Sequence, residues 1–172
     1  MASRHPWNRL LAWLIDWVCI LAWVAIVAAI GVPLYLTGAM PLFDAGVENL
    51  FAFILIIAPI TLALGWRESS VRQATPGKRV RRLIVVSAVT GGRIRFGRAL
   101  ARNALKIALP WEFGHTVTFT LAASGGIVPP WIVPVAALTY ALPIVYVVTL
   151  FVGDGRTLYD RIAGTVVTVA RQ

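Results

Sequence analysis

Long apolar stretches alternate with short polar ones along this chain. Three of them carry almost no charge and exceed or approach the roughly 20 residues that an α-helix needs to cross a bilayer. They cover residues 10–36, 50–66 and 131–152. Prolines inside the second and third stretches do not argue against helices, because membrane helices tolerate proline. The pattern predicts three membrane-spanning helices.

A fourth and more polar stretch, residues 107–124, contains Glu112 and His115. The placement of charge favours a fourth span there. Section 67–106 holds eleven Lys and Arg residues, whereas the loop between the first two spans holds none. Basic residues stay on the cytoplasmic side of a membrane, so this section and the tail 153–172 are predicted to lie there. An even number of crossings must then separate them. A re-entrant segment at 107–124 is the alternative.

Composition and charge agree with a membrane protein. The 172 residues are 59% hydrophobic and 13% charged, which is far from the usual composition of a soluble domain. The formal net charge is +9, but the basic residues lie between apolar runs. The expected anionic partner is therefore the headgroups of the lipid bilayer, and not nucleic acid. We expect one domain over residues 1–172, in the cell (inner or plasma) membrane, with both termini cytoplasmic.

Section 67–106 has local patterns of its own. Residues 82–89 and 93–96 flank a Thr-Gly-Gly turn, which predicts a β-hairpin. Residues 97–109 alternate apolar and basic positions at helical spacing, which predicts an amphipathic helix at the membrane interface. Its basic stripe consists of Arg98, Arg102 and Lys106. The predicted fold class is an all-α membrane protein with about four spans, a cytoplasmic β-hairpin and an interfacial helix.

Ionisable residues within a span are candidate functional groups, because a charge at mid-bilayer costs about 2.5–3.5 kcal/mol on insertion scales. Arg9 and Asp16 lie on one face of the first predicted span. Asp16 lies too deep for direct contact with Arg9, so it needs a basic partner from another segment or must be protonated. Asp16 could handle ions or protons, or it could fasten the span to a neighbour.

Glu112 and His115 form a Glu-x-x-His pair on one helix face. Such a pair can relay a proton, bind a metal or form a structural hydrogen bond. Metal sites in helical bundles usually need this motif twice, so we expect no metal. Cys19 is the single cysteine of the sequence, which excludes a metal site built from several cysteines. Residues 75–78 resemble a phosphate loop only superficially, and they predict a turn. We expect no cofactor and no enzymatic activity.

Three ordered blocks of this sequence resemble the RDD family of membrane proteins, named for one arginine and two aspartates. Arg9 and Asp16 stand at the family's R and first D, and Asp160 stands at its second D. The sequence departs from the family pattern at Pro76, where a bulkier residue is common, and at Tyr159, where histidine is common. The blocks are residues 9–16, residues 75–79 with 96–103, and residues 156–167.

The resemblance implies a transport role, with cation/proton exchange suggested for some members, and it names no substrate. The residues themselves place Asp160 near the inner membrane face. We therefore predict that Asp160 pairs with a basic residue and docks the C-terminal section under the bundle.

The predicted function is transport of a small solute or cation through a polar site between helices. Coupling of this transport to protons is one form of the hypothesis. The candidate site combines Arg9, Asp16 and Asp160, with Glu112 and His115 as secondary candidates. Four spans enclose little volume, so we expect a homo-oligomer or a larger membrane complex. The alternative is a non-catalytic scaffold or accessory subunit. A metal-dependent enzyme using Glu112, His115 and Asp16 is a weaker third hypothesis.

Overall fold

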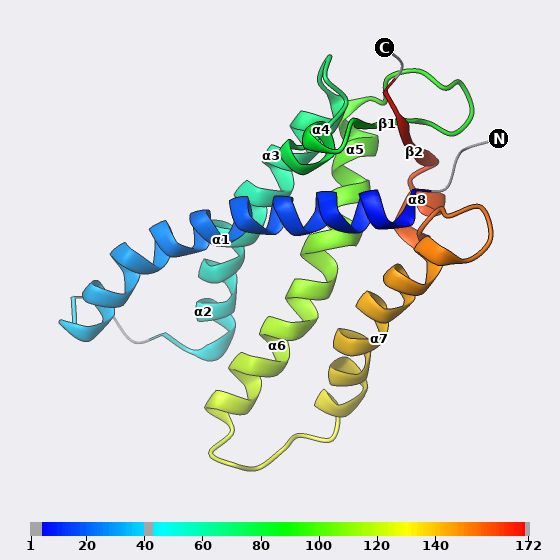
Figure 1. Cartoon of the computed structure of the whole chain (residues 1–172). Coiled ribbons are helices and arrows are strands. Elements are labelled where there is room, and N and C mark those ends of the chain that lie inside the picture. Colours follow the sequence, from blue (N-terminus) through cyan, green and yellow to red (C-terminus); the bar gives the residue numbers. More distant parts are fainter. Residues whose placement is uncertain (1–4, 40–42, 171–172) are drawn as a thin grey trace.

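A computed structural model describes residues 5–39 and 43–170. Residues 1–4, 40–42 and 171–172, which include both ends of the predicted domain, lie outside the described part. The chain is mostly helical, with one small sheet (Figure 1). Its elements, in order, are α1 (Pro6–Leu36), α2 (Ala45–Ala52), the π-helix η1 (Phe53–Ile57), α3 (Ala58–Ser69), α4 (Pro76–Val80), β1 (Leu83–Ser87), α5 (Phe96–Asn103), the π-helix η2 (Ala104–Ala108), α6 (Leu109–Ala123), α7 (Ile132–Phe151), α8 (Leu158–Ile162) and β2 (Thr165–Val169).

Three helical runs among residues 5–39 and 43–170 are long and apolar enough to cross a membrane. They are α1, the run from α2 to α3, and α7, which match the first, second and last predicted spans. The run from α5 to α6 does not join them, because Lys106, Glu112 and His115 interrupt its apolar character. The predicted count of four spans is therefore not confirmed.

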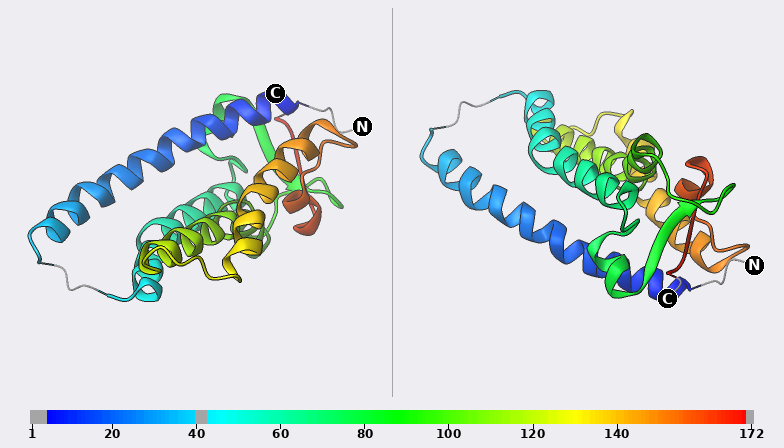
Figure 2. Two further views of the ribbon diagram at one scale, coloured as in Figure 1. Left: turned by 90° about the horizontal axis from the view of Figure 1, so that it is seen from below. Right: turned by 90° about the horizontal axis from the view of Figure 1, so that it is seen from above.

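α1 crosses the other long helices obliquely, whereas the run from α2 to α3, the run from α5 to α6, and α7 lie side by side (Figures 1 and 2). α1 has 31 residues, and an α-helix of that size is about 46 Å long. The hydrocarbon layer is only about 30 Å thick, so a helix this long fits it best when tilted.

Both π-helical segments lie directly before a proline in the next helix, Pro59 or Pro110. Proline has no N–H and crowds the preceding turn, so the carbonyls before it lose their helical partners. Side chains of other helices bind two of these carbonyls. Trp23 Nε1 donates to the carbonyl of Leu55 at 3.0 Å. Tyr146 Oη donates to the carbonyl of Leu105 at 2.7 Å, so these bonds tie α1 to η1 and α7 to η2.

The sheet differs from the predicted hairpin. β1 pairs antiparallel with β2, with Leu83 opposite Val169 and Ser87 opposite Thr165. Strand pairing between β1 and the described residues that follow the Thr-Gly-Gly turn is limited to an isolated bridge between Val86 and Arg93. Residues 165–169 form the second strand of this sheet. β2 contributes Val167 to the buried core that includes Leu83 and Val85 of β1 and Ala12 of α1, and this burial favours its pairing with β1.

The predicted interfacial helix is also different. α5 packs against α3 and continues through η2 into α6 as one helical run. Its Ala99 joins a core with Ala12 of α1 and Val85 of β1. Residues 75–78, predicted to form a turn, belong instead to the start of α4, whose N-cap is Thr75.

The start of α1, α4, the sheet and α8 lie together at one end of the molecule (Figure 1). Sections 67–106 and 153–170 therefore share a side with the beginning of the first helix. This relative arrangement is the one that an even number of crossings requires.

Candidate functional site

Asp16 fastens α1 to α4. Its carboxylate is 2% exposed and accepts hydrogen bonds from Thr75 Oγ1 at 2.6 Å and from the Gly77 N–H at 2.8 Å. Thr75 caps α4, so the carboxylate meets the positive end of that helix. The sequence predicted a basic partner or protonation for Asp16. In place of a basic partner, the structure shows two neutral donors, which can satisfy a buried carboxylate without a counter-charge.

Glu68, at the end of α3, is the centre of a buried group of charges. Its carboxylate accepts a hydrogen bond from Lys78 Nζ at 2.8 Å and from Asn103 Nδ2 at 2.8 Å. Arg102 Nη1 donates to both of its oxygens, at 2.7 and 2.8 Å. Glu68 and Asn103 are 0% exposed and Arg102 is 1% exposed, so these bonds form away from water. Because these groups are buried, removal of one partner would leave another without its counter-charge or hydrogen bond.

Asp160 is a second buried carboxylate. Arg102 Nε donates to its Oδ1 at 2.9 Å, and Arg9 donates to its Oδ2. The Thr157 hydroxyl and N–H also donate to Asp160, at 2.8 and 3.2 Å, which closes a capping box at the start of α8. The predicted pairing of Asp160 with a basic residue is confirmed, and these contacts link α8 to α1 and α5.

These charges form one connected group, and α1, α3, α4, α5 and α8 contribute one member each. We call it the ion-pair network: Arg9, Glu68, Lys78, Arg102 and Asp160.

Arg102 is its bridge, since its guanidinium binds both acids and lies 5.1 Å from the ring centre of Tyr159. Burial alone would raise the pKa of Asp160. The positive charges of Arg102 and Arg9 and the hydrogen bond from Thr157 outweigh burial, and they hold the pKa of this carboxyl well below its usual range.

The predicted basic stripe does not lie along a lipid-facing surface. Arg98 is exposed and donates to Ser87 Oγ at 3.2 Å. Arg102 is buried in the ion-pair network, and Lys106 is half-buried and lines a cavity. The four-residue spacing thus places the later two residues toward the protein interior, where carboxylates from other segments lie.

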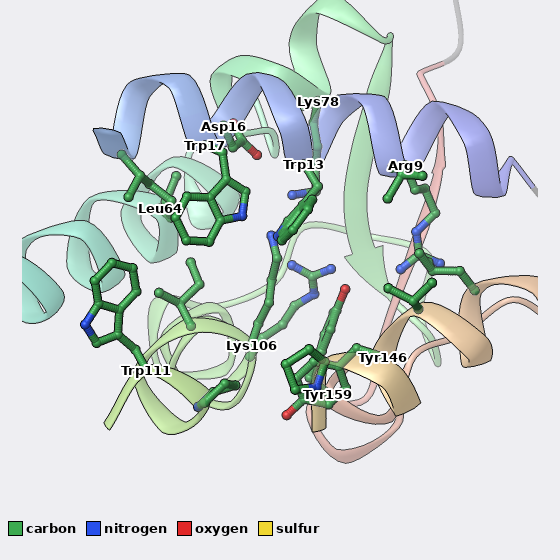
Figure 3. A pocket seen from close by; sticks show the side chains of 18 of the residues that line it. Arg9, Trp13, Asp16, Trp17, Leu64, Lys78, Lys106, Trp111, Tyr146 and Tyr159 are labelled. Atoms are coloured by element: carbon green, nitrogen blue, oxygen red, sulfur yellow. The ribbon is translucent and has the colours of Figure 1, made fainter. Parts of the chain in front are cut away.

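A cavity of about 330 Å³ adjoins the ion-pair network; we call it the inner cavity. Figure 3 shows Lys78 from α4 and Lys106 from η2 extending into this space from opposite sides. The rest of the wall is largely apolar and aromatic, so charges here lie in a medium of low polarity. Its aromatic residues are Trp13, Trp17, Trp111, Tyr146 and Tyr159.

A second polar group, which we call the Glu112 cluster, lies between α2 and α6: Asn49, Trp111, Glu112 and His115. Asn49 Nδ2 donates to Glu112 Oε1 at 2.6 Å, and Trp111 Nε1 donates to His115 Nε2. Glu112 Oε2, Asn49 Oδ1 and His115 Nδ1 are buried atoms without a partner among the described residues. A neutral imidazole whose Nε2 accepts carries its proton on Nδ1.

The structure does not bring Asp16 to Glu112 and His115, because Thr75 and Gly77 hold its carboxylate. Within residues 5–39 and 43–170, no three side chains of His, Cys, Asp or Glu are grouped to hold a metal ion. The ligand set that a metal-dependent enzyme would need from these three residues is therefore not assembled.

Sequence reasoning missed Glu68 and Asn49. A signal for Glu68 was present, since it is the only acidic residue in the strongly basic section 67–106. An isolated acid among many bases is a candidate for a buried ion pair. Asn49 offered no such signal, because a single polar residue at the edge of an apolar run is ordinary.

The apolar helices and the buried charges that join them define a helical membrane protein. The RDD family model matches residues 4–164, and the chain belongs to that family. No match was found among the curated proteins or the solved structures. In the fold, the family's arginine Arg9 pairs with the second aspartate, Asp160, whereas the first aspartate, Asp16, holds α4.

Proposed function

We propose that this membrane protein transports a small solute, best fitted by a cation exchanged for protons, and that the Glu112 cluster is its binding site. The observation that supports this proposal is the pair of buried acceptors, Glu112 Oε2 and Asn49 Oδ1, which lack a donor among the described residues. Hard cations prefer carboxylate and amide oxygens. A carboxylate in an apolar region can also hold a proton in place of a cation, which couples the two.

His115 extends the site by one helical turn. Its Nδ1 has no partner in the described part of the chain, while Trp111 fixes the other ring nitrogen. A histidine held this way can pass a proton to or from the carboxylate region. Glu112 is therefore assigned cation and proton binding, and His115 is assigned proton relay.

The ion-pair network has a structural role in this proposal. Arg9 and Arg102 already neutralise Asp160, and Asp16 is saturated by Thr75 and Gly77. Binding a cation at either aspartate would require breaking those bonds. We assign Arg9, Asp16 and Asp160 to the joining of α1, α4 and α8.

The proposal includes four crossings, cytoplasmic termini and assembly as a homo-oligomer or in a larger complex. Helix runs from Phe96 to Ala123 without a break, which favours a full crossing over a re-entrant segment. That run and α7 are joined at residues 124–131, far from the sheet (Figure 1). Anionic headgroups remain the predicted partner of the exposed basic residues.

Labelling of a single cysteine tests the number of crossings. In a Cys19→Ala background, Ser124→Cys should react with a membrane-impermeant maleimide added outside intact cells, because four crossings place this turn externally. Arg95→Cys, an exposed position in the predicted cytoplasmic section, should react only after permeabilisation. Labelling of the Ser124→Cys variant only from the cytoplasmic side would reject the four-span topology.

Flux measurements test the proposed site. In liposomes with an imposed pH gradient, wild-type protein should carry Na⁺, K⁺ or Li⁺, and Glu112→Gln should lower that flux at least about ten-fold, because a neutral amide cannot exchange a proton for a cation. Glu48→Gln removes a carboxylate next to Asn49 in α2 but outside the cluster, so it is the control and should keep the flux. Equal flux in wild type and Glu112→Gln would contradict the assignment.

The second candidate function is a scaffold or accessory subunit. It is favoured by one specific observation, that all three residues of the family motif are used in internal contacts. Absence of flux for every cation tested, together with copurification of a partner at fixed stoichiometry, would support the scaffold over the transporter.

A further inference from the structure

Among the described residues, basic side chains outnumber carboxylates at the inner cavity and its border. Four cations meet three carboxylates there, in a largely apolar setting. The cations are Arg9, Lys78, Arg102 and Lys106, and the carboxylates are Asp16, Glu68 and Asp160. An ammonium group in an apolar setting keeps its charge only beside a counter-charge, so this excess of basic groups favours a negatively charged ligand.

Lys106 is the residue that carries the surplus. The other three cations each donate to a buried carboxylate, at Glu68 or Asp160. The Lys106 ammonium group makes no hydrogen bond or ion pair with any residue that the structure describes. It also faces Lys78 across the cavity, which adds repulsion that an anion between them would relieve (Figure 3).

Trp17 supplies a second free donor. Its Nε1 is buried and lacks an acceptor within the described part of the chain. Figure 3 shows the indole nitrogen of Trp17 turned toward the middle of the cavity. Buried N–H groups are nearly always bonded, so an ammonium and an indole N–H at one cavity together indicate an acceptor supplied by a ligand.

The rest of the cavity wall is apolar, which favours a ligand with an apolar part next to its anionic group. Pro110, Trp111 and Val147 are among the apolar and aromatic residues that line the cavity. A cavity of about 330 Å³ is at the small end of the range of about 300–1,000 Å³ that ligand sites occupy. It therefore fits a single headgroup and the first part of one chain.

We propose that the inner cavity binds an anionic amphiphile, whose carboxylate or phosphate accepts hydrogen bonds from Lys106 and Trp17 while its chain lies against Pro110, Trp111 and Val147. The site is separate from the Glu112 carboxylate and does not depend on the transport proposal. A cation does not fit it, since Lys78 and Lys106 would repel one.

Quenching of tryptophan fluorescence by brominated ligands tests the proposal, because three tryptophans line the cavity. The full-length protein in nanodiscs of neutral phosphatidylcholine is titrated with a soluble brominated fatty acid in one arm. In the other arm, the nanodiscs contain phosphatidylglycerol with brominated chains. A brominated fatty alcohol serves as the neutral probe. Saturable quenching by the fatty acid alone identifies a water-soluble anion, and quenching by the phospholipid alone identifies a membrane lipid; either outcome supports the proposal.

Variants identify the binding residues. Lys106→Gln should weaken anion binding about ten-fold or more, because it removes the charged donor. Lys106→Arg should retain most of the affinity, and Trp17→Phe should weaken binding with the aromatic wall kept. Arg95→Gln removes one positive charge from an exposed position outside the cavity and should leave binding unchanged.

Equal quenching by the alcohol and the anions, or equal affinity in Lys106→Gln and wild type, would overturn the proposal. Absence of saturable quenching in both arms would overturn it as well. Lys106→Gln must elute as wild type on gel filtration, and Lys106→Arg provides the comparison if it does not. Glu112→Gln should bind the amphiphile normally even where it abolishes cation flux, so failures of the two proposals are distinguishable.

Discussion

Replacement of Arg102 by methionine should lower the free energy of unfolding by about 3–5 kcal/mol, the range measured when one partner of a buried ion pair is removed. Methionine has similar bulk, so the loss reflects charge and hydrogen bonding more than a cavity. Glu68 and Asp160 would both lose a direct donor while staying buried. Reversible unfolding in mixed micelles by added dodecyl sulfate, followed by tryptophan fluorescence, measures the effect.

Arg98→Met is the matched control for Arg102→Met. Arg98 lies one turn earlier in α5 and is exposed, and its side chain donates to Ser87 but to no other residue within 5–39 and 43–170. Its loss should cost less than about 1 kcal/mol, as for other exposed polar contacts. Arg102→Lys should fall between the two variants, because one ammonium group cannot reproduce the fork that binds two acids. Equal stability of Arg102→Met and Arg98→Met would contradict the structural role of the ion-pair network.

Replacement of Gly77 by alanine should separate α4 from α1. A Cβ atom at residue 77 would lie 2.0 Å from the carbonyl oxygen of Ala12 and 3.0 Å from Asp16 Oδ1. The obstacle is backbone, so it cannot rotate away, and the hydrogen bond from the residue 77 N–H to Asp16 would be lost together with close packing. We expect a loss of about 3 kcal/mol or more, from overpacking plus an unsatisfied buried acceptor.

Gly97→Ala is the control for this substitution. Gly97 lies in α5, and a Cβ atom there would meet nothing within 4 Å. Alanine also favours helix over glycine by up to about 1 kcal/mol, so the control should match or exceed wild type in stability. The apparent melting temperature in detergent compares the two variants directly. A Gly77→Ala protein as stable as Gly97→Ala would show that α4 does not approach α1 this closely.

Features of the fold that depend on local sequence were predicted, whereas features that depend on contacts between distant segments were not. Long apolar runs placed α1, the α2 to α3 run and α7 correctly, because their length and composition alone meet the requirement of a bilayer. The sheet was assigned the wrong partner for β1. Turn chemistry favours the nearer strand, but apolar packing with a strand far along the chain was stronger, and no local pattern records such a contact.

The candidate site was predicted in part for the same reason. Pairing of Asp160 with a basic residue followed from its depth and its basic surroundings. The identity of its partners did not follow, since Arg9 and Arg102 reach it only after three separate segments pack. Lys106 was placed on a lipid-facing stripe because helical spacing gives a face but not the direction in which that face points.

The pairing of β1 with β2 sets an order for biogenesis. The two strands lie about 80 residues apart, with α7 between them. During synthesis, β1 emerges early and must keep an unpaired edge while the later helices insert. Asp160 also reaches Arg9 and Arg102 only at that late stage, so the C-terminal section is the last part of the chain to join the first helix and the central section.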